Sequence, residues 1–325
     1  MSTISIGRKP KAGGLFRRLW KYRWLYLLLL PGAVYYLIFN FGPLPYLRIA
    51  FQKYSPQAEL LGNSSAWMSP IFQNFIVFFQ SKDFSRLLVN TLWLGVLGTA
   101  IGFPIPIILA LMLNEMRSDK LKRVLQSSMY LPHFISWAVM ASIVMMLIGP
   151  APNGLVNSML KAAGKSQIPF LESEEWFRAV YIVENIWKEA GWGTIIYLAA
   201  LSGVDEQLYE AAAIDGAGRW KQLLHVTLPA ISSTIVISLI LKMGSFLDTG
   251  FDQIYLLQNS LNRQVSEVFD TYIYDVGLLG KYKPAKGIST YSYGSAIGIV
   301  KSIVSTALVL GTNALSHLVG EEGLM

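Results

Sequence analysis

Cysteine is absent from this sequence, and charged residues are scarce. The 325 residues include no cysteine and only three histidines, which lie far apart in the chain. Disulfide frameworks and cysteine metal sites are therefore excluded, and no cluster of metal ligands is indicated. Charged residues make up 14% of the chain and hydrophobic residues 53%. This composition is typical of a membrane protein and is too apolar for a soluble domain of this length.

Enzyme chemistry, nucleotide binding and nucleic-acid binding are not indicated either. We find no pair of acids, nucleophile with base, or metal ligands at a consistent depth, so we expect no catalytic residues. Gly164-Lys165-Ser166 imitates the end of a phosphate-binding loop, but Met159 stands where the first glycine is required. The net charge of +7 would suit nucleic acid, but orientation and lipid headgroups explain basic residues in a membrane protein. We expect the lipid bilayer as a partner and no nucleic acid.

Six apolar segments are long enough to cross a bilayer as helices, which takes about 20 residues each. This predicts an all-α polytopic membrane protein with a basic tail over residues 1–21 and a single transmembrane domain over residues 22–325. Residues 115–129 are amphipathic and are expected at the inner surface, and residues 251–286 are expected to form a polar external loop. The predicted spans are residues 24–41, 88–113, 131–148, 176–203, 229–248 and 293–318.

The distribution of basic residues predicts a cytoplasmic N-terminus. With that orientation, the inner segments hold thirteen Lys and Arg, seven of them between Arg8 and Arg23, and the longer outer loops with their flanks hold eleven. The higher inner density is what the positive-inside rule expects. Four crossings then return the chain to the cytoplasm at residue 204, where a polar loop over residues 204–228 begins.

This loop has the signals of two short helices joined by a sharp turn. Asp205 can cap the first helix, and the alanines after Glu210 keep its surface slim. Gly216 and Gly218 permit a reversal, after which a second short helix can run up to Pro229. The pattern predicts a helix-turn-helix knob on the membrane face, and small side chains there allow another surface to approach closely.

The same letters carry a resemblance to a known family. Glu210-Ala211-Ala212, Gly216 and the run Val226-Thr227-Leu228-Pro229 resemble the EAA loop of permease subunits of type I ABC importers, with Val226 where isoleucine is usual. Asp215-Gly216-Ala217 is similar to the carbohydrate-importing, maltose-like subclass. Leu30-Pro31-Gly32 together with Ala50-Phe51 and Tyr54 is similar to its polysaccharide-type branch.

The resemblance implies a fold, partners and a location. It implies the type I ABC importer fold with six transmembrane helices in the bacterial cytoplasmic (inner) membrane. Its partners would be a second homologous permease, two cytoplasmic ATPase subunits that bind ATP and Mg, and an extracytoplasmic solute-binding protein. The chain itself would bind no cofactor and no metal. It would move an oligosaccharide or polysaccharide by alternating access.

The resemblance also assigns the knob to contact with the ATPase subunit. It implies polar contact by Glu210, close fit by the alanines, a turn at Gly216, and packing of apolar side chains on the second short helix against either the membrane domain or the ATPase. The residues assigned in this way are Glu210, Ala211, Ala212, Asp215, Gly216, Ala217, Trp220, Leu223, Leu224, Leu228 and Pro229.

Ionisable residues inside the spans are a second functional signal, since each costs at least ~2.5 kcal/mol at a helix centre on insertion scales. Glu184 and Lys188 are four residues apart on one helical face, which suits an ion pair. Such charges either pair to fix packing or line a translocation path, and several lysines would favour an acidic, uronate-type sugar such as alginate. The candidate path residues are Glu184, Asn185, Trp187, Lys188, Trp192, Tyr197, Lys242 and Lys301. The alternative function is an ion-coupled secondary transporter that works without an ATPase.

Overall fold

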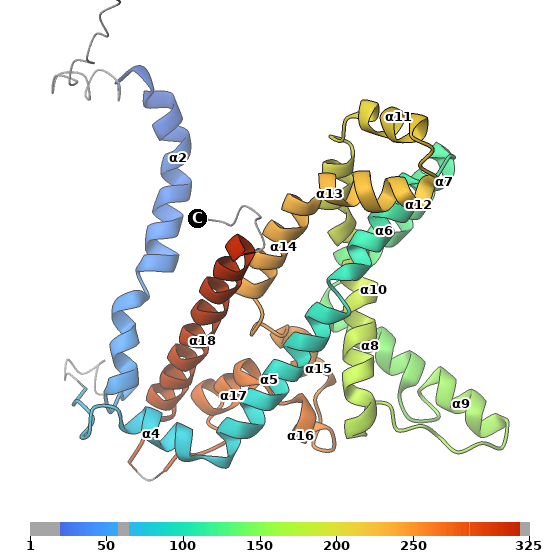
Figure 1. Ribbon diagram of the computed structural model, residues 1–325. Coiled ribbons are helices and arrows are strands. Elements are labelled where there is room, and N and C mark those ends of the chain that lie inside the picture. The colour runs from blue at the N-terminus through green and yellow to red at the C-terminus, as the bar shows by residue number, and fades with distance from the viewer. Residues whose placement is uncertain (1–19, 58–64, 286, 319–325) are drawn as a thin grey trace, which may run out of the picture. The chain divides into compact units, whose positions relative to one another are not determined.

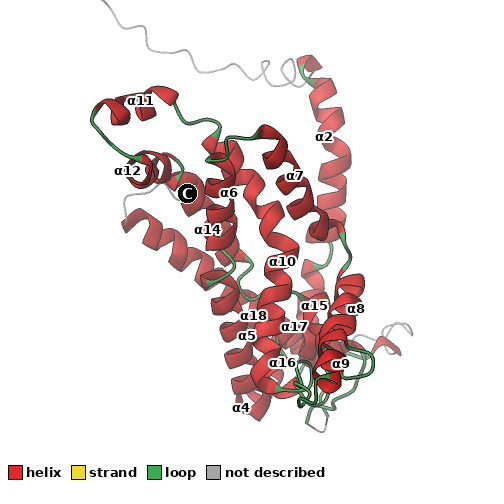
Figure 2. Ribbon diagram, turned by 90° about the vertical axis from the view of Figure 1, so that its right-hand side faces the viewer, coloured by secondary structure: helices red, strands yellow, loops and turns green. Residues whose placement is uncertain are grey.

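The computed structural model describes residues 20–57, 65–285 and 287–318, and within these ranges the regular elements are helices (Figures 1 and 2). Two units divide the chain, the first ending at Ile49 and the second beginning at Ala50. In the first unit, α2 (Arg23–Tyr36) runs into a π-helical turn, η1 (Leu37–Phe41). A 3-10 helix, η2 (Leu44–Phe51), then leads into the second unit. Pro31 lies inside α2.

The second unit is built from helices of very different length. The longest are α10 (Glu174–Leu201) and α18 (Thr290–Leu318). The other elements are α4 (Gln73–Gln80), α5 (Lys82–Ala100), α6 (Pro104–Asn114), α7 (Asp119–Tyr130), η3 (Leu131–Phe134), α8 (Trp137–Ile148), α9 (Leu155–Ala162), α11 (Glu206–Ile214), α12 (Arg219–Gln222), η4 (Leu223–Thr227), α13 (Leu228–Ala230), α14 (Ser232–Gly244), α15 (Phe251–Leu257), α16 (Arg263–Ser266), α17 (Phe269–Ile273) and η5 (Tyr274–Leu278).

Several helices are long and apolar enough to cross a membrane. Within the described residues, three pass by length and composition, at Arg23–Phe51, Lys82–Asn114 and Thr290–Ala314, and two bent pairs raise the number to five if each pair is one span. α10 has 28 residues but carries charges along its length. Each of the six predicted spans overlaps one of these helices or pairs, and several apolar helices indicate a multi-pass membrane protein.

Two predicted spans are bent rather than straight. Residues 131–148 divide into η3 and α8, and the pair formed by Asp119–Phe134 and Trp137–Ile148 bends by 102°. Ser136 starts the new helix because its hydroxyl accepts from the amide of Val139 at 3.4 Å. α8 has 12 residues, or about 18 Å, which is short of a bilayer core of about 30 Å. The second bend, of 59°, separates Arg219–Ala230 from Ser232–Gly244.

Residues 251–286 were expected to form a loop, and this expectation is wrong. The segment contains four short helices, α15, α16, α17 and η5. Phe269, Tyr272 and Val276 are buried there and pack with Phe78 and with residues of α18. The ring of Tyr272 stacks on that of Tyr282 with 6.0 Å between centroids. Helices of four to seven residues are too short to produce a recognisable helical period, so the sequence pattern did not reveal them.

α10 is the central helix of the second unit, and it packs against α5, α6, α7, α14 and α16 (Figure 2). Gly191 allows one close approach, since a Cβ there would collide with the backbone carbonyl of Met129 at the end of α7. Phe177 and Ile182 of α10 join Leu94 of α5 and Ile254 of α15 in a buried cluster. Functional side chains on α10 are therefore held by neighbours on several sides.

Candidate functional site

The first candidate site is the knob formed by α11, α12 and η4. Asp205 caps α11 as expected, with its carboxylate accepting from the amide of Gln207 at 3.0 Å. The predicted coupling residues follow in order along the knob. Glu210, Ala211 and Ala212 lie on α11, Asp215 is its C-cap, Gly216 and Ala217 form the turn, Trp220 lies on α12, Leu223 and Leu224 lie in η4, and Leu228 and Pro229 lie in α13.

Gly216 makes the reversal at the end of α11. Its φ is +77°, in the left-handed region that glycine adopts without a steric cost. The amide of Gly216 donates to the carbonyl of Ala213 at 3.0 Å, and that of Ala217 donates to Ala212 at 2.9 Å. This pair of bonds is a Schellman motif, which satisfies carbonyls that the helix end would otherwise leave free.

A hydrogen bond that the sequence did not suggest connects the two halves of the knob, α11 and η4. The hydroxyls of Tyr209 on α11 and Thr227 in η4 lie 3.0 Å apart, and Thr227 is buried. Arg219 approaches Glu115, at the end of α6, at 4.0 Å. The first contact joins α11 to η4, and the second joins α12 to the end of α6.

Apolar side chains lie exposed on the knob. Ile214 is 87% and Trp220 77% exposed, and Leu224 is also exposed, whereas Leu223 is half-buried. Large apolar side chains clustered on a surface mark a contact site for another protein or for lipid. Of the packing side chains expected on the second short helix, Leu223 thus turns partly inward, and Trp220 and Leu224 remain free for a partner.

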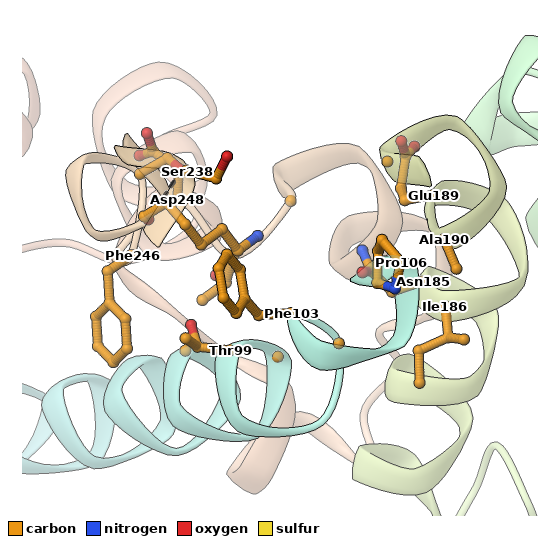
Figure 3. A pocket seen from close by; sticks show the side chains of 18 of the residues that line it. Thr99, Phe103, Pro106, Asn185, Ile186, Glu189, Ala190, Ser238, Phe246 and Asp248 are labelled. Atoms are coloured by element: carbon orange, nitrogen blue, oxygen red, sulfur yellow. Dashed lines mark hydrogen bonds between the residues drawn. The ribbon is translucent and has the colours of Figure 1, made fainter. Parts of the chain in front are cut away.

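The second candidate site is a cavity of about 530 Å³ enclosed by α5, α6, α10, α14 and the α14–α15 connection. Figure 3 shows Thr99 and Phe103 on one side of it, Asn185 and Glu189 on α10, and Ser238, Phe246 and Asp248 on other elements. Four of the predicted path residues line it. They are Asn185, Trp192, Tyr197 and Lys242. Glu184, Trp187, Lys188 and Lys301 lie outside its lining.

Lys188 does not line the cavity but holds α10 against the bend between η3 and α8. Its buried ammonium donates to the carbonyls of His133 at 2.6 Å and Ile135 at 2.5 Å, where the chain bends between η3 and α8. Carbonyls at the end of a helical turn have no partner within the turn, so a buried cation there satisfies them. The expected ion pair with Glu184 does not form, because this bend, distant in sequence, takes the ammonium.

Glu184 also fastens one element to another. It is 3% exposed, and its carboxylate accepts from the side-chain amide of Gln253 on α15 at 2.9 Å. The same amide nitrogen of Gln253 donates to the carbonyl of Tyr181 at 2.9 Å. Trp187 is exposed and lines a separate, mainly apolar groove with Trp176, and Glu184 is part of the same lining. The sequence thus identified Glu184 as special but not Gln253, whose polar side chain gave no signal of its own.

Two carboxylates in the cavity wall have side-chain partners. Glu189 meets Nδ1 of His133 at 2.8 Å, and the ring of His133 stacks on Trp192 with 4.5 Å between centroids. Asp248 accepts from Lys301 on α18. Among the described residues, the ammonium of Lys242 forms no ion pair or side-chain hydrogen bond. The cavity therefore combines one free cation with aromatic and polar groups.

Opposite the knob, a network of ion pairs holds the short helices that follow α15. Glu267 accepts from Arg86 on α5 and from Arg263 on α16, the latter at 2.5 Å. Asp275 in turn accepts from Arg263 at 3.0 Å and from Lys281 at 2.8 Å. The hydrogen bond to Asp275 raises the pKa of Lys281. Each carboxylate here has two cations, which joins α5, α16 and η5.

Tyr272 belongs to the same region. Its hydroxyl donates to Asp83 at 3.0 Å, and its ring lies against Tyr282. Burial raises the pKa of Tyr272, and the neighbouring hydroxyl of Tyr293 and carboxylate of Asp83 raise it further. No group of three or more His, Asp or Glu that could hold a metal occurs in the described ranges.

Known proteins resemble the chain over nearly its full length. It is 45% identical to Protein LplB of Bacillus subtilis (strain 168), over 93% of this chain and 91% of that protein. It is 46% identical to the polygalacturonan/rhamnogalacturonan transport system permease protein YteP of the same organism, over 98% of this chain and 95% of that protein.

A solved structure is also similar to this chain. A chain in the crystal structure of a bacterial alginate ABC transporter, in complex with alginate pentasaccharide-bound periplasmic protein, matches with a TM-score of 0.82 and 37% identity. The match covers 95% of this chain and 99% of that chain.

A protein-family model also matches this chain. The model described as binding-protein-dependent transport system inner membrane component matches residues 102–320. This confirms the resemblance seen in the EAA loop, and it favours an ATP-driven permease over a secondary transporter and over an enzyme. The chain belongs to the family of binding-protein-dependent transport system inner membrane components.

Proposed function

We propose that this permease imports acidic, uronate-containing oligosaccharides, and that the cavity beside α10 is part of their path. The observation that carries the proposal is the ammonium of Lys242, which forms no ion pair within the described residues, since the carboxylates of Glu189 and Asp248 in the same wall meet His133 and Lys301 instead. Trp192 and Tyr197 line the same cavity, and aromatic faces with polar edges suit sugar rings. The names of two relatives point the same way, since one transports polygalacturonan or rhamnogalacturonan and the other alginate.

The knob is proposed as the contact with a cytoplasmic ATPase subunit. Its apolar tip at Ile214 and Trp220 is exposed, and Tyr209 and Thr227 tie α11 to the helices that continue into α14. α14 in turn contributes Ser238 and Lys242 to the cavity. Movement of the knob would therefore displace the residues that α14 contributes to the cavity wall. The motor would be two ATPase subunits that bind ATP and Mg, and this chain would bind neither.

The remaining partners complete the proposal. A second, homologous permease would supply the facing half of the path, and a solute-binding protein would deliver the oligosaccharide from outside. The chain would lie in the bacterial cytoplasmic membrane with its N-terminus in the cytoplasm, an orientation supported by the seven basic residues between Arg8 and Arg23.

The test compares an acidic sugar with its methyl ester, which keeps the sugar rings but carries no charge. The complete complex, with its ATPase subunits and solute-binding protein, is reconstituted in proteoliposomes and given a galacturonate trisaccharide or its methyl ester. We expect Lys242→Gln to lower uptake of the acidic sugar severalfold more than uptake of the ester, because one charged contact is lost. Lys242→Arg, which keeps the charge, should stay close to the unaltered protein. An equal effect of Lys242→Gln on both sugars would refute the role of the ammonium.

A further inference from the structure

A second ammonium lies close to the cavity without lining it. Lys301 projects from α18 and donates to two carboxylates that belong to different elements. Asp270 on α17 accepts through both oxygens, at 2.6 and 2.9 Å. Asp248, in the connection between α14 and α15, accepts through one oxygen. One cation thus holds two anions, and the bond to Asp270 is the more extensive of the two.

The two carboxylates differ in their access to the cavity. The side chain of Asp248 is 63% exposed and lines the cavity, where Figure 3 shows it among the side chains of the wall. The side chain of Asp270 is 24% exposed and that of Lys301 14%. Asp248 therefore connects the cavity wall with the ammonium, and Asp270, which does not line the cavity, holds the same ammonium.

The position in the membrane makes this arrangement selective. Lys301 is the twelfth residue of α18, so it lies about 16 Å along the helix from its first residue. A cation at such a depth needs an anionic partner. Another carboxylate can replace Asp248 there and keep two anions on the ammonium, whereas a neutral sugar would leave it with Asp270 alone. The displaced Asp248 remains in a wall that also contains the free ammonium of Lys242.

We propose that Lys301 is a carboxylate-recognition point of the translocation path, with Asp248 as an internal substitute that a uronate carboxylate of the passing oligosaccharide replaces. Asp270 is the positioning residue that keeps the ammonium in place during the exchange. The inference rests on the proposed import of acidic oligosaccharides, and it names the group that would sense the acid.

The two carboxylates permit a matched test, because the same change is made to two partners of one lysine. Uptake efficiency at low substrate concentration is measured for the galacturonate trisaccharide and for its methyl ester, in the complete reconstituted complex with its solute-binding protein. We expect Asp248→Asn to raise the ratio of acidic to ester uptake by about threefold or more, since a competing charged hydrogen bond is removed. Asp270→Asn should lower this ratio, because Asp248 then has the ammonium to itself.

The outcomes separate the inference from the function on which it rests. A change in the same direction for both variants, or no change in the ratio for either, would overturn the exchange while acidic uptake by the unaltered complex still supports the proposed function. A loss of uptake shared equally by both sugars would indicate a structural role only and would also overturn it. Failure of the unaltered complex to import the acidic sugar would refute both. If Asp248→Asn does not assemble with its ATPase subunits, Asp248→Ser provides the same comparison.

Discussion

At the scale of single residues, the intramembrane charges of this permease divide into those that hold helices together and those that face the cavity. Lys188 and Glu184 belong to the first group, since each is buried against backbone or amide groups of a neighbouring element. Lys242 and Asp248 belong to the second. Only contacts made by distant parts of the chain distinguish the two groups, because all four residues carry charge in or next to apolar segments.

Lys188 gives the first prediction. Replacing it by methionine leaves the carbonyls at the bend between η3 and α8 buried without a donor. We expect the complex to lose about 1 to 3 kcal/mol of stability, the usual cost of such groups. The thermal unfolding midpoint of the detergent-purified permease measures the loss. Lys165→Met, at an exposed position, is the control and should leave the midpoint unchanged. Equal midpoints for Lys188→Met and Lys165→Met would show that the bend does not need the ammonium.

A second prediction concerns Gly216 and its neighbour Gly218. No atom lies within 4 Å of an added Cβ at either position, so space does not distinguish them. Backbone conformation does, because φ is +77° at Gly216 and −70° at Gly218. Valine at position 216 should cost about 1 to 2 kcal/mol or force the turn to change. We expect Gly216→Val to insert normally but to lose sugar-stimulated ATPase activity and transport, and Gly218→Val to keep both. Normal transport by Gly216→Val would show that the turn is not needed for coupling.

At the scale of elements, the short helices after α15 form a cap held by charge, and this leads to a prediction about pH. The pKa of Lys281 is raised by its hydrogen bond to Asp275. The pKa of Tyr272 is raised by burial and its neighbours. Both groups hold their protons more tightly in the folded protein. Their contribution is complete below their ordinary pKa values, near 10, and is lost as pH rises above them.

The measurement is the unfolding midpoint of the purified permease between pH 8 and pH 11.5. We expect a steep fall beginning near pH 10. Combining Lys281→Met with Tyr272→Phe should lower the midpoint at pH 8 and flatten the fall above pH 10, because neither replacement titrates. A fall of unchanged steepness in the double variant would place the alkaline sensitivity elsewhere.

The knob supports a prediction about assembly. Trp220 is the largest exposed side chain on the second half of the knob, and a buried aromatic anchor often dominates a protein interface. We expect Trp220→Ala to weaken copurification of the ATPase subunits at least tenfold in apparent affinity, about 1.4 kcal/mol. Trp67→Ala, which removes an exposed tryptophan outside the knob, should leave copurification intact. Retention of the ATPase subunits by Trp220→Ala would exclude the indole as an anchor.

At the scale of the whole molecule, the sequence predicted features with local signals and missed features that distant segments create. Asp205, Gly216 and Pro229 announce the knob because caps, turns and helix ends are set by near neighbours. The partners of Lys301 could not be predicted from local signals, since Asp270 lies in a segment that the sequence predicts as a loop. The bend that Lys188 fastens is 55 residues away from it in the chain.

The membrane domain itself was predictable because a bilayer demands long apolar helices, and the described residues form three of them, or five if each bent pair is one span. Their straightness was not predictable, because the chain bends directly after η3 and directly after α13. Which face of each helix meets the cavity was likewise not predictable, since Trp187 and Trp192 are similar in sequence context but line different hollows. Family membership then gives the class of function, and the cavity charges give the proposed class of sugar.

The most direct test of a motor-driven path for acidic sugars is uptake of a labelled galacturonate trisaccharide into proteoliposomes that hold the complete complex. The solute-binding protein is supplied outside, and ATP with Mg is enclosed inside. The account predicts uptake with enclosed ATP, and none with a non-hydrolysable analogue or with a proton or sodium gradient alone. Accumulation driven by an ion gradient, in vesicles that contain the permeases without ATPase subunits, would contradict it.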